Sequence, residues 1–201
     1  MAQNIYDNPA FFEGYAQLPR SVQGLDGAPE WPALTAMLPD LSGKSVVDLG
    51  CGYGWFCRAA RELGAADVTG VDISEKMLAR AAELTADPQI HYQRSDLESL
   101  ALKDNSLDLV YSSLALHYLP ELDTLFANVQ RALKPGGSLV FSMAMAAWAA
   151  NSSARRISSA SKSPGPSRSI RFSTPTTSPL ASKGTASIRR KETSVAAPPP
   201  S

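Results

Sequence analysis

The chain has 201 residues, equal numbers of basic and acidic side chains, and two cysteines, which predicts one domain with room for a tail. Two cysteines, Cys51 and Cys57, are too few for a disulfide framework, so we expect free thiols in a reducing cytoplasm. A signal peptide begins with basic residues, but no lysine or arginine precedes Arg20. The longest mainly apolar run, residues 139–150, is shorter than the roughly 20 residues that span a membrane. We therefore exclude secreted disulfide-rich and membrane-spanning classes.

The zero net charge hides a division of the chain into an acidic part and a basic part. Residues 1–141 hold 10 lysines and arginines against 18 acids, whereas residues 142–201 hold 9 against 1. With the patterns below, this predicts an N-terminal helical lid at 1–43, an α/β core at 44–142 and a basic low-complexity tail at 143–201.

Aromatic and apolar side chains recur at helical spacing before the core. The positions are Phe11, Phe12 and Tyr15 in one segment, and Trp31, Leu34, Met37 and Leu38 in another. We expect two helical segments that cover the mouth of a site in the core. Ordinary helix packing is the alternative interpretation of these side chains.

A strand, a glycine turn and a helix open the core. Residues 45–49 form a short apolar run typical of a buried parallel strand. Gly50, Gly52 and Gly54 then allow the close approach of a ligand to the backbone. A helical stripe follows, and this order indicates the first unit of a nucleotide-binding α/β sheet. The stripe consists of Phe56, Ala59, Ala60 and Leu63.

The spacing of the glycines argues against a dinucleotide. A Gly-x-Gly-x-x-Gly fingerprint starting at Gly50 would place its third glycine at position 55, which is Trp55, whereas the third glycine here is Gly54. Asp48 precedes the first glycine by two residues. A carboxylate there would repel a pyrophosphate and suits a cofactor that carries an ammonium group. A dehydrogenase is therefore disfavoured.

The second predicted strand, residues 67–71, ends at an acid. Asp72 follows it, where a carboxylate can accept hydrogen bonds from both hydroxyls of a ribose. Dinucleotide folds share this feature, so Asp72 alone does not identify the cofactor, and a helix-capping acid is the alternative. Ser74 is the predicted N-cap of the helix that follows.

Three more strands complete the predicted sheet, at residues 90–93, 107–112 and 138–142. A helix over residues 122–133 precedes the last strand, and the Lys-Pro-Gly-Gly turn at 134–137 ends it. The fold class is therefore α/β, with a Rossmann-like, doubly wound parallel sheet of five recognisable strands flanked by helices.

The pattern Asp-x-Gly-x-Gly-x-Gly over residues 48–54 resembles motif I of the class I S-adenosylmethionine (SAM)-dependent methyltransferases. The resemblance extends over residues 43–141, with four further segments in the family's order, and residues 11–21 resemble the lead-in of small bacterial type-11 methyltransferase domains. It implies SAM as cofactor, no metal, and methyl transfer to a small-molecule acceptor.

The resemblance also implies a set of cofactor contacts. Ile73 and Met77 would flank the adenine, while Asp96 accepts a hydrogen bond from its amino group and the Leu97 N–H serves a ring nitrogen. Core packing for Met77 and a solvated loop acid for Asp96 remain the alternatives. The full set is Asp48, Gly50, Cys51, Gly52, Gly54, Asp72, Ile73, Met77, Asp96, Leu97, Ser112 and Arg20.

Three of the implied roles concern the methionyl end and the acceptor. Ser112 would meet the methionyl group, and Arg20 could pair with its carboxylate, although a solvated surface arginine is an equal alternative. His117 would lie near the acceptor as a general base, or it may only cap or pack a helical turn.

The recognisable pattern stops after Ser142. Residues 151–201 are rich in Ser, Arg, Pro and Thr, so we expect disorder there and no trace of the family's closing C-terminal strands, which leaves the strand at 138–142 with a bare edge. Our hypothesis is a truncation by a shifted reading frame or a misjoined gene. Translation of the other two frames beyond codon 142 tests it.

Two other functions stay open. The chain could be a non-catalytic, truncated methyltransferase fragment that binds SAM weakly or not at all. It could instead be a nucleic-acid methyltransferase that uses the basic tail as an electrostatic arm. The tail has almost no aromatic residues for base stacking and the core is acidic, so nucleic acid and membrane partners are disfavoured.

Overall fold

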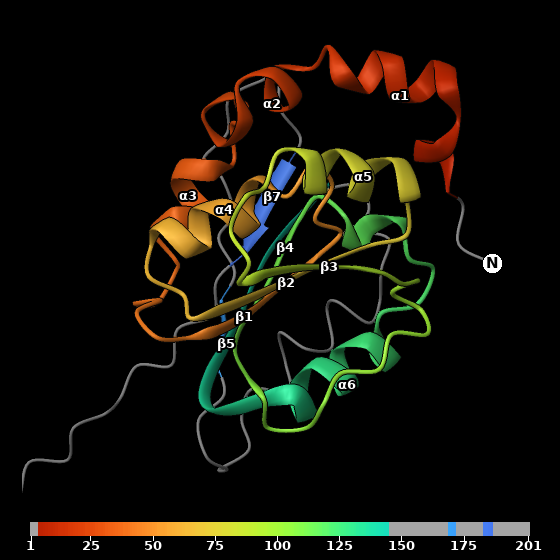
Figure 1. The fold of residues 1–201 in the computed structure, drawn as a ribbon. Coiled ribbons are helices and arrows are strands. Elements are labelled where there is room, and N and C mark those ends of the chain that lie inside the picture. The colour runs from red at the N-terminus through yellow and green to blue at the C-terminus, as the bar shows by residue number, and fades with distance from the viewer. Residues whose placement is uncertain (1–3, 145–168, 172–182, 187–201) are drawn as a thin grey trace, which may run out of the picture.

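The computed structural model describes residues 4–144, 169–171 and 183–186, and its centre is one twisted sheet with helices on both faces (Figure 1). Five parallel strands form the main part of this sheet, in the spatial order β3-β2-β1-β4-β5. This confirms the predicted five-stranded Rossmann-like fold. The strands are β1 (Ser45–Leu49), β2 (Asp67–Asp72), β3 (Ile90–Arg94), β4 (Leu107–Ser113) and β5 (Leu133–Ala144).

The strand order fixes where a ligand can bind. The chain moves outward from β1 through β2 to β3, then returns to pair β4 with the other side of β1. In open α/β sheets the crevice at such a reversal, beyond the carboxyl ends of the strands, is the usual ligand site. The glycine turn leaves β1 at this point.

Helices cover the sheet on both sides because neighbouring residues of a strand face opposite ways. Val47 of β1 lies in a cluster with Phe126, on the face covered by α6 (Asp123–Ala132). Val46 lies in the opposite cluster with Phe56 of α4 (Trp55–Glu62). α5 (Glu75–Glu83) shares that second face, and a single 3-10 turn, η3 (Leu116–Tyr118), follows β4.

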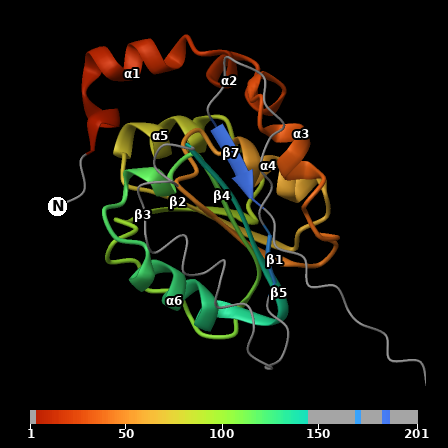
Figure 2. The same ribbon diagram turned by 180° about the vertical axis from the view of Figure 1, so that it is seen from behind.

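The N-terminal segment is helical, as predicted. It contains η1 (Ile5–Asp7), α1 (Pro9–Ala16), α2 (Pro19–Val22), η2 (Gly24–Gly27) and α3 (Trp31–Thr35). The Asn8 side chain accepts hydrogen bonds from the N–H groups of Ala10 and Phe11, which caps α1. α1 and α2 lie on the outside of the molecule beyond α5 and α4, seen from both sides in Figures 1 and 2, and η1 contacts α5.

The far edge of β5 differs from the sequence prediction. β6 (Ser169–Arg171) pairs with β5 in parallel, and β7 (Lys183–Ala186) pairs with it antiparallel. The expected disorder is therefore wrong at these two segments, and the edge is not bare. The physical reason is that a strand edge presents unpaired N–H and C=O groups to any extended segment, whatever its composition. The rest of the disorder prediction lies outside the described residues.

Candidate functional site

The turn after β1 depends on its glycines. Gly50, Gly52 and Gly54 have φ values of 76°, 52° and 69°, in the left-handed region that favours glycine. A Cβ at Gly50 would overlap the Cβ of Ala115, and a Cβ at Gly54 would overlap the Tyr92 hydroxyl. The sequence therefore places glycine where the turn passes under η3 and where α4 begins.

The tip of β2 is joined to this turn by Asp72. One carboxylate oxygen of Asp72 accepts a hydrogen bond from the Gly52 N–H at 2.9 Å, and the other accepts one from the Ser74 N–H at 2.9 Å. Burial raises the pKa of Asp72, and the hydrogen bonds from Ser74 and Gly52 oppose that rise. The Ser74 hydroxyl caps α5 by accepting from the Met77 N–H, as predicted.

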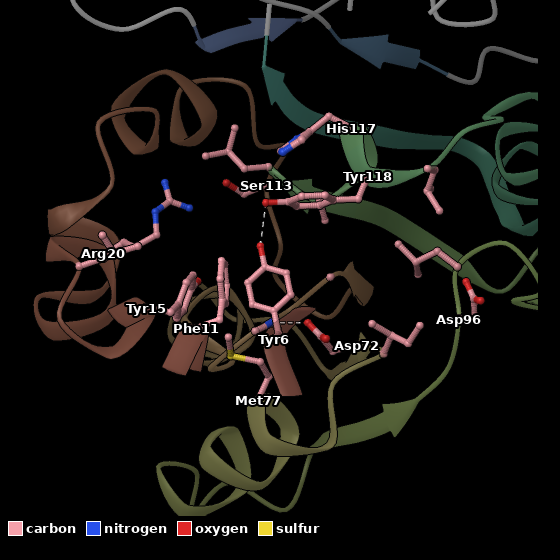
Figure 3. Close-up of a pocket in the computed structure, with 18 residues that line it drawn as sticks. Tyr6, Phe11, Tyr15, Arg20, Asp72, Met77, Asp96, Ser113, His117 and Tyr118 are labelled. Carbon is pink, nitrogen blue, oxygen red and sulfur yellow. Dashed lines mark hydrogen bonds between the residues drawn. The ribbon is translucent and has the colours of Figure 1, made fainter. Parts of the chain in front are cut away.

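A cavity of about 330 Å³ opens beside the turn (Figure 3). In Figure 3, Arg20 and Asp96 lie at opposite ends of it, with Asp72 and Met77 on one wall. The structure thus gathers most of the predicted site residues around one space. Those that line it are Arg20, Gly50, Gly52, Asp72, Ile73, Met77, Asp96, Leu97 and His117.

Three predicted residues point elsewhere. Ser112 is fully buried and donates to the Leu49 carbonyl at 2.7 Å, while its neighbour Ser113 lines the cavity. The one-residue difference reverses the side of the strand, because successive side chains alternate. Gly54 packs against Tyr92 and does not line the larger cavity. Cys51 is a buried free thiol whose sulfur lies beside Gly70 within the core.

Asp48 also lies outside the larger cavity. It is 3% exposed and accepts a weak hydrogen bond from the Cys57 thiol at 3.7 Å. Burial raises the pKa of Asp48 to about 8, against the thiol's lowering effect and with a further rise from Asp72. The side chain therefore carries a proton near neutral pH, so the sequence argument from a charged carboxylate at this position does not hold in the structure.

Sequence reasoning missed an aromatic wall of the cavity. The Tyr6 hydroxyl donates to the Tyr118 hydroxyl at 3.0 Å, which joins η1 to η3. The Tyr6 ring meets the rings of Phe11 and Tyr15 edge to face, at centroid distances of 5.0 and 5.5 Å. Helical spacing had marked Phe11 and Tyr15, but no pattern marks Tyr6 or Tyr118.

A buried acid was missed as well. Glu30 is 6% exposed, forms an ion pair with Arg20 and accepts a hydrogen bond from the Ser113 hydroxyl at 3.0 Å. It lines a second cavity of about 80 Å³, which borders the first and shares Arg20, Gly50 and Ser113 with it.

The described part of the chain lacks a metal-binding cluster and a membrane-spanning helix. Within it, no three His, Cys, Asp or Glu side chains gather in a way that could hold a metal ion. None of its helices has both the length and the hydrophobicity to cross a membrane.

Comparison with known proteins identifies the fold family. A family described as a methyltransferase domain matches residues 47–141, from β1 to β5. A SAM-dependent methyltransferase from Mesorhizobium loti superposes with a TM-score of 0.59 at 59% identity, over 60% of this chain and 55% of that one. Residues 47–141 therefore match a methyltransferase family, and the chain is similar to SAM-dependent methyltransferases. These similarities confirm the family resemblance and the SAM cofactor that the sequence predicts.

Other relatives of this chain differ in what their names say they act on. A malonyl-[acyl-carrier protein] O-methyltransferase from Pectobacterium atrosepticum is 39% identical over 108 residues, which cover 54% of this chain and 42% of that protein. A phosphoethanolamine N-methyltransferase from Haemonchus contortus, in complex with phosphoethanolamine and S-adenosylhomocysteine (SAH), has a TM-score of 0.58 at 28% identity, over 67% and 31% of the two chains. This chain spans about half the length of the first curated relatives it matches, 57% of one and 42% of another.

Proposed function

We propose that this chain binds SAM in the larger cavity and transfers its methyl group to a small-molecule acceptor. The observation that carries the proposal is the Asp72 carboxylate, held at the tip of β2 by the Gly52 N–H, in the same cavity as Asp96 and Leu97. A carboxylate there suits the two hydroxyls of a ribose, and a second acid with a neighbouring backbone N–H suits an adenine edge.

The cavity residues fit SAM along its length. Ile73, Met77 and Leu97 supply apolar lining for the adenine, and Asp96 lines the same cavity. Asp72 and Gly52 are assigned to the ribose, and Arg20 lies at the end opposite Asp96, where the methionyl group would extend past Gly50 and Ser113. Cys51, Gly54 and Ser112 act in this account by shaping the turn and strand rather than by contact.

The chain contributes position and exclusion of water. SAM supplies a methyl group made electrophilic by its sulfonium, and an attacking O, N, S or C atom needs only to be held in line with it. Holding reactants in such a geometry can contribute about 7–11 kcal/mol. Tyr6, Phe11 and Tyr118 line the same cavity, with Tyr6 beside Asp72 in Figure 3, and residues 4–43 act as the predicted lid.

His117 is the proposed general base. It lines the cavity from η3 beside Tyr118, at a ring-centroid distance of 4.3 Å. A neutral imidazole there can take the proton that an oxygen or nitrogen acceptor releases. His117→Asn should lower kcat while the SAH dissociation constant stays unchanged.

The relatives' names suggest which acceptors to try first. They include a malonyl-[acyl-carrier protein] O-methyltransferase, a trans-aconitate 2-methyltransferase and a phosphoethanolamine N-methyltransferase. Arg20 is the only lysine or arginine among the residues that line the described cavity. Because Arg20 is assigned to the methionyl carboxylate, the described lining of this cavity offers no second cation to an acceptor. We therefore favour small acceptors without an anionic group next to the methyl, used in the reducing cytoplasm that two free thiols suit.

Transfer of radiolabelled methyl from SAM to a panel of small carboxylic acids, amines and phenols tests the proposal, with SAH release as the readout. Turnover of any acceptor that is lost in Asp72→Ala supports it. SAH binding without turnover of any acceptor would favour the second candidate, a chain that binds the cofactor without catalysis.

A further inference from the structure

Glu30 presents a carboxylate oxygen to a cavity. The residue immediately precedes α3 and its side chain is 3% exposed. One oxygen, Oε1, forms the ion pair with the Arg20 guanidinium and accepts the hydrogen bond from the Ser113 hydroxyl. The other, Oε2, is buried and has no hydrogen-bond partner among the residues that the structure describes.

Such an oxygen is uncommon in a folded protein. Most buried polar atoms have a partner, and leaving a buried charged acceptor without one is costly. Burial alone would raise the pKa of Glu30, but the charge and hydrogen bond of Arg20 outweigh it and lower the pKa below its usual value. Glu30 is therefore ionised, and Oε2 is a charged acceptor with room for a donor.

The room is the second cavity, of about 80 Å³. Its walls include Glu30, Arg20, Gly50 and Asp48, and it shares Arg20 with the larger cavity, at the end opposite Asp96 in Figure 3. This volume holds a group the size of a water molecule or an ammonium ion. Asp48, which carries a proton near neutral pH, adds no second negative charge.

Arg20 and Glu30 together form a dipole of fixed direction. The guanidinium borders both cavities, and the carboxylate borders only the smaller one. An α-amino acid carries a carboxylate and an ammonium group two bonds apart, with opposite charges in the complementary order. Each end of such a ligand would meet a partner of opposite charge, and Oε2 would gain its missing donor.

We propose that Glu30 recognises the α-ammonium group of the cofactor's amino-acid end, while Arg20 recognises the adjoining carboxylate. The inference rests on the proposed function, because it takes SAM or SAH as the ligand. It assigns to Glu30 a direct contact with the ligand. If Glu30 served only to hold the N-terminal helices on β4 through Arg20 and Ser113, its loss would weaken every ligand alike.

Three ligands separate these roles on the full chain. SAH carries both charged groups, its deaminated analogue adenosylthiobutyrate keeps the carboxylate alone, and methylthioadenosine has neither. Isothermal titration should give a loss of about 10-fold or more from SAH to the deaminated analogue with the wild-type chain, since a charge-assisted hydrogen bond is removed. In Glu30→Gln that loss should shrink to within about 3-fold, and methylthioadenosine should bind as it does to the wild type.

Two controls accompany the variant. Glu13→Gln changes an exposed glutamate of α1 and should leave the full 10-fold preference in place. Ser113→Ala removes a donor to Oε1 and a contact with the Ser142 hydroxyl but leaves Oε2 in place, so it should keep the preference for the ammonium group even where it weakens SAH binding itself.

The outcomes are distinct. Equal wild-type affinity for SAH and the deaminated analogue overturns the inference even if Glu30→Gln fails to fold. A weakening of all three ligands by the same factor in Glu30→Gln also overturns it, in favour of the helix-holding role. Failure of the wild-type chain to bind SAH or methylthioadenosine overturns the proposed function itself, and the inference with it.

Discussion

The carboxylate of Asp72 accepts a hydrogen bond of 2.9 Å from the backbone N–H of Gly52, and so links the ends of β2 and β1. The two residues are 20 positions apart in the chain and are brought together by the parallel pairing of the two strands. The bond orients one side of the carboxylate and leaves the residue on the cavity wall.

Loss of this carboxylate should remove cofactor binding without unfolding the sheet. Asp72→Ala deletes the acceptor for two ribose hydroxyls, and we expect the SAH dissociation constant to rise at least about 10-fold. Isothermal titration measures it. Asp67→Ala, at the opposite end of the same strand and half-exposed, is the matched control and should bind SAH normally. Equal binding by both variants would contradict the assignment of Asp72.

The glycine turn should not tolerate a side chain at position 50. Gly50→Ala would hold alanine at a φ of 76° and press its Cβ into Ala115. We expect a loss of about 2–4 kcal/mol in the free energy of unfolding. Gly14→Ala lies within α1 with open space around it, and should stabilise the chain by about 0.5–1 kcal/mol. Chemical denaturation of both variants checks the prediction, and similar stabilities would refute the strain at Gly50.

The buried Asp48 should make stability depend on pH. Its pKa is about 8 in the folded chain, against about 3.9 in an unfolded one. Between these values the folded state keeps a proton that the unfolded state has lost, so stability falls as pH rises, by about 1.4 kcal/mol per pH unit for one group. The contribution is complete below pH 4 and is lost by pH 8.

Asp48→Asn removes the carboxyl group whose pKa differs between the folded and the unfolded state. The gain in stability of the variant over the wild type should therefore grow from pH 5 to pH 8 and then level off. Urea denaturation of the ligand-free chain at several pH values measures it. Asp72, whose pKa is also raised by burial, leaves some pH dependence in the variant. A stability difference that stays constant across this range would show that Asp48 is ionised when folded.

The N-terminal segment should be released when Asp7 is removed. Asp7 accepts hydrogen bonds from the Ser74 hydroxyl at 2.5 Å and the Lys76 N–H at 3.3 Å, and so docks η1 on the start of α5. Residues 1–43 contain one site for trypsin, Arg20. Asp7→Ala should speed cleavage there, and SAH should protect the wild type more than the variant.

The control for the lid is Asp26→Ala, an exposed acid in the same segment. It should leave the rate of cleavage at Arg20 unchanged. An Asp7→Ala chain that is cut at the wild-type rate would mean that η1 does not hold the segment in place.

Local pattern was enough to predict the sheet and one wall of the site. Buried parallel strands are continuous apolar runs, and an acid at the tip of such a strand, Asp72, is visible from its position alone. Ser112 shows the limit, because the direction of its side chain depends on strand register, and Ser113 lines the cavity instead.

Contacts between distant segments could not be predicted. Tyr6 meets Tyr118 across 112 positions, and Ser113 meets Glu30 across 83, with no periodic signal at Tyr6 or Glu30. The protonation of Asp48 follows from burial and from neighbours that only the fold supplies. The strands β6 and β7 pair with β5 through backbone groups, and the amino-acid composition of a segment does not predict such pairing.

Thermal unfolding of the full chain with and without SAH tests the central claim most directly. At a concentration of about 100 times its dissociation constant, a ligand that binds only the folded state adds about 2.7 kcal/mol, which raises Tm by several degrees. We predict one cooperative transition that moves upward with SAH in the wild type and by about half as much or less in Asp72→Ala, whose affinity for SAH is at least about 10-fold lower. A cooperative transition that SAH leaves unmoved in the wild type would contradict a cofactor site in this cavity.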